Sequence, residues 1–129
     1  MNRCYRSALD ALLGGTLDLL ADPIAVALYG PDAVFSEGHD IIDHLWDQVA
    51  VAAEPLDGRA VANRTLTAFD VTFPAVPDGA VVASLVLYRV SDQQLVAWLD
   101  QRPDLAPISV IGNGGPVTFA WAHGVVFRL

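Results

Sequence analysis

Short apolar segments, separated by turn residues at even spacing, dominate the chain from Asp57-Gly58 to its end. Several short strands at such spacing are typical of a β-sandwich or barrel. We therefore predict a mainly β fold, an antiparallel β-sandwich or partly closed barrel with one or two short helices. The expected strands cover Ala60 to Leu66, Ala68 to Phe73, Ala80 to Val90, Gln94 to Asp100, Pro116 to Ala122 and Val125 to Leu129.

The turn residues and the apolar faces predict how some of these strands connect. Pro77-Asp78-Gly79 and Asn113-Gly114-Gly115 are typical turns, since proline presets φ and Asn or Gly tolerates positive φ. The segment from Ala80 to Val90 is apolar on both faces, which predicts a central strand covered on two sides. The last two strands each present one apolar face, and we expect them to form a hairpin across His123-Gly124.

The first half of the chain predicts the helices. Apolar residues at helical spacing indicate a helix over Asn2 to Leu13, and Gly14-Gly15 ends it. The expected strands are Thr16 to Leu20 and Ile24 to Tyr29. From Glu37 to Ala53, apolar residues return to helical intervals, so this segment predicts a second helix or helical loop.

Composition restricts the class of protein. A chain of 129 residues predicts a single β-rich domain over 1–129, and 53% hydrophobic residues are more than one core requires, so some should meet a partner. No apolar run is long enough to cross a bilayer and no signal-peptide core follows the N-terminus, so we expect no membrane partner and synthesis in the cytoplasm. A net charge of −8 without lysine disfavours nucleic acid.

A polar cluster in the middle segment is the best candidate for chemistry. On a helix, Asp40, Asp43, His44 and Asp47 would share one face and present carboxylates and an imidazole to a cation. His39 and His44 are five residues apart, however, and the zinc-protease pattern needs a spacing of four. A solvated acidic helix face is therefore the favoured interpretation, and we predict no metal, no cofactor and no catalytic residue. A metal-dependent hydrolase using His39, Asp40, Asp43 or His44 stays an alternative.

Other candidate residues have simpler interpretations. His123 lacks a nucleophile and an orienting partner in any known pattern, and Cys4 has no second cysteine to pair with. Trp46, Trp98 and Trp121 lie in apolar periodic segments, which favours packing in a core or an interface. A carbohydrate-binding module that stacks sugars on Trp98 or Trp121 is a further alternative.

Over nearly its full length, the chain resembles a group of small structural proteins of tailed phages. The similar segments are the opening Ala8 to Gly15, the strands Phe69-Asp70-Val71-Thr72-Phe73, Leu85-Val86-Leu87-Tyr88-Arg89 and Leu95-Val96-Ala97-Trp98-Leu99-Asp100, and the closing Gly112 to Leu129. These segments are turns and core strands, so no functional residue follows from them. The loop Val90-Ser91-Asp92-Gln93-Gln94 departs from the group, which has a shorter loop with Asp-Thr-Gly there.

The resemblance implies a virion structural protein and no enzyme. The leading expectation is a capsid decoration, or cement, protein on the particle surface that binds and stabilises the major capsid shell, commonly as a homotrimer. A tail, baseplate or head-to-tail component that binds tail proteins is the alternative. From the apolar pattern, we expect the oligomer interface to include Ile24, Leu45 and Trp46.

Overall fold

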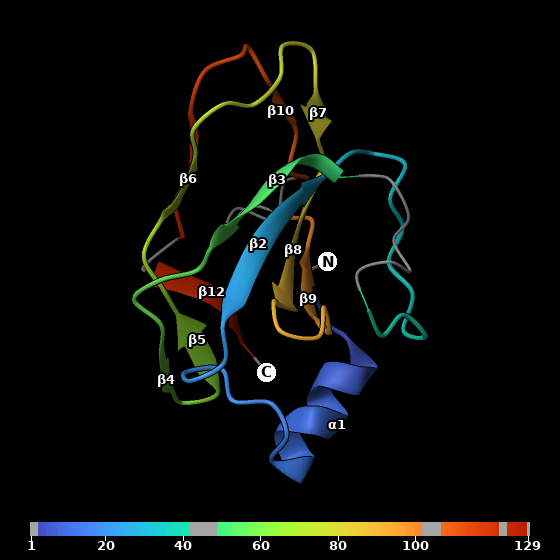
Figure 1. The fold of residues 1–129 in the computed structure, drawn as a ribbon, viewed down its shortest axis with the longest axis vertical. Helices are drawn as coiled ribbons and strands as arrows, with labels where there is room; N and C mark the ends of the chain where they lie inside the picture. Colours follow the sequence, from blue (N-terminus) through green and yellow to red (C-terminus); the bar gives the residue numbers. More distant parts are fainter. Residues whose placement is uncertain (1–2, 42–48, 102–106, 122–123, 129) are drawn as a thin grey trace.

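The computed structural model describes residues 3–41, 49–101, 107–121 and 124–128, and these residues form a mainly β fold (Figure 1). One helix, α1 (Arg6–Gly14), follows the first short strand. The predicted fold class is confirmed, with antiparallel sheets and no closed barrel among the described strands. The strands are β1 (Arg3–Cys4), β2 (Ile24–Tyr29), β3 (Val49–Pro55), β4 (Ala60–Ala62), β5 (Thr65–Thr67), β6 (Val71–Phe73), β7 (Val81–Val82), β8 (Ser84–Arg89), β9 (Leu95–Leu99), β10 (Val110–Ile111), β11 (Val117–Phe119) and β12 (Val125–Arg128).

A five-stranded antiparallel sheet in the order β1-β9-β8-β2-β3 forms the centre of the molecule. Every residue of β2 and β9 is buried, and so are the first four residues of β8. These strands are therefore covered on both faces, as predicted for the segment around β8. Their continuous apolar sequences follow from this position, because neither face meets water.

Three smaller antiparallel sheets complete the fold, in the orders β12-β5-β4, β11-β6 and β10-β7. The first two lie along the β3 side of the central sheet, and the β10-β7 ribbon projects at the opposite end of the molecule from α1 (Figure 1). The rings of Phe73 and Phe119 meet edge to face across β6 and β11, with their centroids 5.8 Å apart. The small sheets thus add their inner faces to one core.

In Figure 1 the loop after β2 lies on the side of the central sheet away from the small sheets, and α1 lies at the lower end of the molecule. The ring of Phe35 lies 4.9 Å from Tyr5 and 6.3 Å from Trp98, between centroids, and the guanidinium of Arg3 lies 4.2 Å above Phe35. Trp98 is buried, so the packing interpretation of this tryptophan is confirmed. Burial also raises the pKa of the Tyr5 hydroxyl.

The opening helix is confirmed at its C-terminal end, but its predicted start at Asn2 is wrong, because Arg3–Cys4 forms strand β1 beside β9 and the helix begins at Arg6. It ends where Gly15 adopts a left-handed φ of 78° and donates its N–H to the carbonyls of Ala11 and Leu12. No helix within the described part of the chain combines the length and apolarity needed to span a membrane.

The predicted helix from Glu37 to Ala53 is wrong in both of its described parts. Residues 37–41 form a turn and an isolated bridge between Ile41 and Gln94, and Val49–Pro55 is strand β3, paired with β2. Apolar residues at helical intervals gave this prediction, but β-branched valines suit a strand, and pairing with β2 decides the conformation.

Three predicted strands need a second correction. Residues 16–18 have no regular structure and residues 19–21 form a turn, in which the Asp18 carboxylate accepts the N–H groups of Leu20 and Ala21. The segment Ala60 to Leu66 folds back on itself as β4 and β5, and Ala80 to Val90 divides into β7 and β8. In the first two cases side-chain or turn chemistry breaks a segment that is apolar enough for one strand.

The expected C-terminal hairpin is also wrong. β11 pairs with β6 and β12 pairs with β5, so the partners of the two closing strands lie 44 to 63 residues earlier in the sequence. An apolar face shows which side of a strand is buried, but it does not show which strand lies beside it.

Candidate functional site

The densest polar cluster is centred on Arg89 at the end of β8, whose side chain is only 13% exposed. Its guanidinium donates to both carboxylate oxygens of Asp92 at 3.0 and 2.8 Å, and to Asp22 Oδ2 at 2.9 Å. It also donates to the carbonyl of Thr16 at 2.6 Å and to Gln94 Oε1 at 2.7 Å. One arginine therefore ties the loop after α1 to the loop between β8 and β9.

The electrostatics of this cluster indicate that its charged groups hold the two loops together. Hydrogen bonds from the Asp18 backbone and from Arg89 lower the pKa of Asp22, and Arg89 likewise lowers the pKa of Asp92. The two carboxylates raise the pKa of Arg89 in turn. All three groups stay charged at neutral pH and bind each other, so none is poised to exchange a proton with a substrate. The β8–β9 loop is thus held by Arg89, the last residue of β8.

The polar segment around His39 is only partly described. Glu37 forms a 3.6 Å ion pair with Arg6 between two exposed side chains, and Asp40 accepts the N–H of Leu95 through its main-chain carbonyl. Asp43, His44 and Asp47 lie outside the described residues. Among the residues that the structure does describe, no group of three His, Cys, Asp or Glu could hold a metal ion.

The predicted interface residues are not brought together by the described structure. Ile24 begins β2 and is buried in the core, which leaves its side chain almost no surface for a partner. Leu45 and Trp46 lie outside the described residues, as does His123. The buried Trp98 ring has no open face for a sugar, and the half-buried Trp121 donates its indole N–H to the carbonyl of Phe69 at 2.9 Å.

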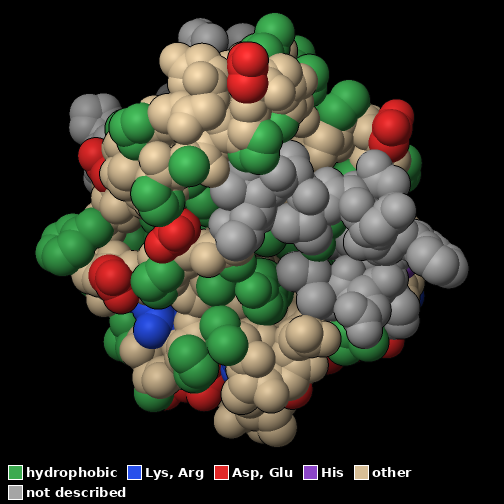
Figure 2. Space-filling view, turned by 45° about the horizontal axis from the view of Figure 1, so that its top comes forward, with side chains coloured by type: hydrophobic (Ala, Val, Ile, Leu, Met, Phe, Trp, Pro, Cys, Tyr) green, Lys and Arg blue, Asp and Glu red, His purple; other side chains and the backbone are tan. Residues whose placement is uncertain are grey.

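An apolar pair at the tip of the β7-β10 ribbon was not predicted as a contact surface. Val81 and Ile111 lie directly opposite each other on the paired strands, and both are exposed, Ile111 to 68%. The face turned toward the reader in Figure 2 carries hydrophobic side chains spread between acidic ones, with little basic surface. Ala80 to Val90 was predicted as a single covered strand, and this hid the exposure of Val81.

The ribbon is held rigidly by main-chain hydrogen bonds between its two loops. The pairs are Gly79 N–H to Gly112 O at 2.9 Å, Gly112 N–H to Ala80 O at 2.8 Å, Gly114 N–H to Val76 O at 2.7 Å and Val76 N–H to Gly115 O at 3.0 Å. A Cβ on Gly112 would lie 2.2 Å from the Pro77 carbonyl oxygen, so the loops approach more closely than any side chain permits. The apolar pair is therefore presented on a preorganised element.

A second exposed apolar region lies along β4, at the left margin of the molecule in Figure 1. Val61 is 48% exposed on this strand, and Phe69, which follows β5, is 70% exposed. The Phe69 ring fills the place of a Gly58 side chain, since a Cβ there would lie 2.4 Å from Phe69 Cγ. Phe69 also donates its N–H to the carbonyl of Asp57 at 2.9 Å, which holds the main chain of Phe69 next to an exposed aspartate.

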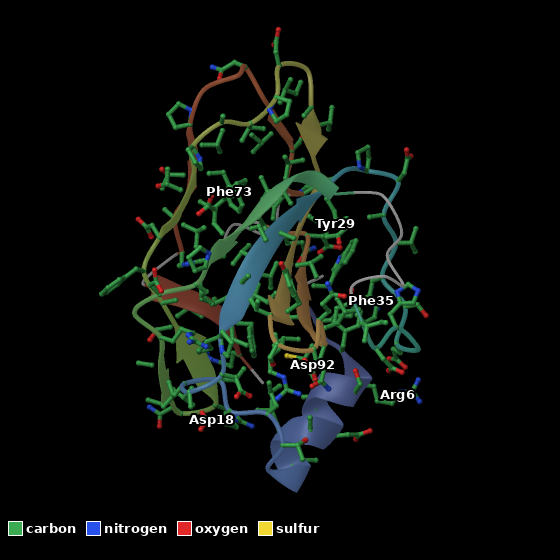
Figure 3. The ribbon with its side chains drawn as sticks, viewed as in Figure 1. Arg6, Asp18, Tyr29, Phe35, Phe73 and Asp92 are labelled. Atoms are coloured by element: carbon green, nitrogen blue, oxygen red, sulfur yellow. The ribbon has the colours of Figure 1, made fainter. Side chains whose placement is uncertain are left out.

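Sequence reasoning missed both apolar regions for the same reason. Val61, Val81 and Ile111 have strand-like neighbours, and a sequence pattern does not show which strands end at a free edge. Figure 3 shows the labelled side chains of the interior and of the α1 end, with Phe73 and Phe35 on opposite sides of the central sheet.

Comparison of the chain with protein-family models, with curated proteins and with solved structures gave no significant match.

Proposed function

We propose that this protein is a structural component of a tailed-phage particle, a capsid decoration protein that binds the outside of the major capsid shell and associates with itself. In this proposal it is made in the host cytoplasm and carries out no catalysis. A component of the tail, baseplate or head-to-tail connection is the alternative, with tail proteins as partners. The resemblance of its strand segments to those of small phage proteins is one ground for this proposal.

The rigid apolar tip of the β7-β10 ribbon is the observation that supports the proposal best. Val81 and Ile111 form an exposed apolar pair on an element that four main-chain hydrogen bonds hold in place. Because the ribbon is already ordered, such a pair loses little conformational entropy when it docks into a groove of the capsid shell. The densest polar cluster, around Arg89, is meanwhile used to hold the fold together. Binding through shape and apolar area therefore suits this surface better than chemistry does.

A binding experiment with phage shells tests the proposal. Purified protein is mixed with shells that lack it, and bound protein is measured after sedimentation of the shells. We expect Ile111→Asp to reduce binding by at least tenfold, because a charge would be buried at the contact. Leu13→Asp is the control, since Leu13 is 90% exposed at the opposite end of the molecule. Equal loss in both variants, or no binding of the wild type to shells, would contradict the proposal.

The position of the protein in an electron-microscopy map of the particle separates the two versions. Density for this fold on the outer capsid surface supports decoration. Density in the tail or baseplate supports the alternative. Particles without the protein would rule out both versions.

A further inference from the structure

We propose that self-association, which is part of the proposed function, runs through the free edge of β4, with two copies pairing edge to edge about a two-fold axis at Val61. β4 is the last strand of the β12-β5-β4 sheet, and all three of its residues are exposed. Natural edge strands avoid pairing by being very short or by carrying a charge, a proline or a bulge. β4 has three residues, but Ala60-Val61-Ala62 carries no charge, no proline and no bulge.

The hairpin geometry directs the main-chain groups of Val61 outward. Asn63 and Arg64 have φ of 53° and 61°, which makes the connection between β4 and β5 a two-residue turn with two left-handed residues. In such a hairpin the residues that flank the turn, Ala62 and Thr65, form a hydrogen-bonded pair. Hydrogen-bonded pairs alternate, so the N–H and C=O of Val61 point away from β5. These are the two groups that a symmetric antiparallel pair joins at its centre.

An apolar row across the sheet also ends at this edge. Phe127 of β12 lies opposite Leu66 of β5, and Leu66 lies opposite Val61 of β4. The first two side chains are buried, whereas Val61 at the end of the row is half exposed. A second copy paired at Val61 would place its own valine beside this one and continue the row into its own sheet.

The same register brings a cation to an aromatic ring. When Val61 lies opposite Val61 of the second copy, the Asn63-Arg64 turn lies next to the bend at Gly58 that precedes β4 in that copy, where the Phe69 ring occupies the side-chain position. Asp57 is the next residue, and its side chain is exposed. An arginine over an aromatic ring and beside a carboxylate gains a cation–π contact and an ion pair. By symmetry this arrangement occurs twice in the dimer.

Arg64 is available for this contact. The arginines at 3, 6, 59, 89 and 128 each bind a neighbour within the chain, whereas Arg64 is exposed and forms no ion pair or hydrogen bond in the described structure. Its backbone also has a left-handed conformation, which glycine adopts freely, Asn and Asp tolerate, and other residues disfavour. In a chain of net charge −8, an unpaired arginine at a strained turn fits a contact with an acidic copy of the same chain.

Sedimentation velocity over a concentration series tests the edge contact. We expect a monomer–dimer equilibrium, since three paired residues and two polar clusters form a contact smaller than the roughly 1,200 Å² of stable complexes. Val61→Lys should weaken the dimer at least tenfold, and Val81→Lys, a matched change on the other ribbon, should leave it unchanged. A monomer at all concentrations, or an oligomer that Val61→Lys leaves intact, would overturn the proposal. Thermal melting confirms that each variant is folded.

A charge exchange tests the register. Arg64→Glu and Asp57→Arg should each weaken the dimer, because each places like charges opposite each other twice, and the double variant should recover at least part of the loss. Loss of folding cannot produce such a recovery. Additive losses in the double variant would reject this register.

Cysteine cross-linking gives an independent measure of the two-fold axis. In an antiparallel hydrogen-bonded pair the Cα atoms are about 5.5 Å apart, within the range of a disulfide. Val61→Cys in a Cys4→Ala background should therefore form a covalent dimer under mild oxidation, and Val81→Cys should not. Equal cross-linking of the two variants would count against the assignment.

The outcomes also separate this contact from the proposed function. If Val61→Lys abolishes the dimer but the wild type never binds a phage particle, the edge contact stands and the phage function fails. If the wild type binds particles but sediments as a monomer or as a trimer insensitive to Val61→Lys, the phage function stands and the edge contact fails.

Discussion

Gly112→Ala is a sharp test of the packing at the β7-β10 ribbon. The added Cβ would lie 2.2 Å from the carbonyl oxygen of Pro77, 2.6 Å from Val76 Cγ1 and 2.9 Å from the Val76 carbonyl oxygen. Two of these three atoms belong to the backbone, so a side-chain rotation does not relieve the overlap. The two loops must instead move apart.

The size of the effect follows from that movement. Overpacking a tight contact costs about 1 to 3 kcal/mol. Separation of the loops also weakens the hydrogen bonds of Gly112 to Gly79 and Ala80, at roughly 1 kcal/mol each. We expect the free energy of unfolding to fall by about 3 to 5 kcal/mol. With an unfolding entropy of about 2.1 cal/mol/K per residue, a chain of 129 residues loses about 4 °C per kcal/mol, so the melting temperature should fall by about 12 to 20 °C.

Thermal and urea unfolding, followed by circular dichroism, measure this loss. The matched control is Gly114→Ala in the same loop, because a Cβ there meets no atom within 4 Å but φ is +85°. Its left-handed backbone should cost about 1 to 2 kcal/mol. A Gly112→Ala variant that loses less than about 1 kcal/mol, or no more than Gly114→Ala, would refute the close approach of the two loops.

Three further predictions concern the Arg89 cluster, the cysteine and the helix end. The lowered pKa of Asp22 means that its carboxylate stabilises the fold above about pH 4 and loses this effect as the pH falls through its folded pKa. Asp22→Asn should therefore melt below wild type at pH 7, and in melts across pH the difference should shrink as the pH falls below the ordinary range of an aspartate. Burial raises the pKa of the Cys4 thiol to about 12, so iodoacetamide at pH 8 should modify it far more slowly in the native protein than in urea, as mass spectrometry would show; equal rates would contradict its burial. Gly14→Ala should raise the melting temperature by up to about 4 °C, because a Cβ there meets nothing within 4 Å and alanine favours the helix; a fall in calorimetric melting temperature would show that the position needs glycine.

The local features of the fold were readable from the sequence. The opening helix, its glycine stop, strand β2 and the Pro77-Asp78-Gly79 turn were expected near where they occur, because each depends on residues adjacent in the chain. Partner choice was not readable. β11 and β12 were expected to pair with each other, but their partners are β6 and β5, and only tertiary packing determines such distant pairs.

The candidate surface was harder to predict than the fold. The apolar pattern predicted an interface at Ile24, but that residue fills the core. Val61, Val81 and Ile111 are ordinary β-branched residues in strand-like segments, and their place at the end of a sheet or ribbon leaves them exposed. The sequence did not single out Arg89, because its five acceptors lie on two loops that only the fold brings against it.

Arg64 connects the stability of the hairpin with the proposed self-contact. Glycine suits the second position of a turn with two left-handed residues, so Arg64→Gly should remove backbone strain and stabilise the isolated monomer by up to about 1 kcal/mol. The same change removes the cation that we propose to lie over Phe69 of a second copy, so dimerisation should weaken while melting of the dilute monomer improves. Residues in strained conformations persist at functional positions when the contact they make outweighs the local cost. If Arg64→Gly stabilised the monomer and left association unchanged, the strain at this turn would have no connection with the dimer, and Arg64 would have no role in dimerisation.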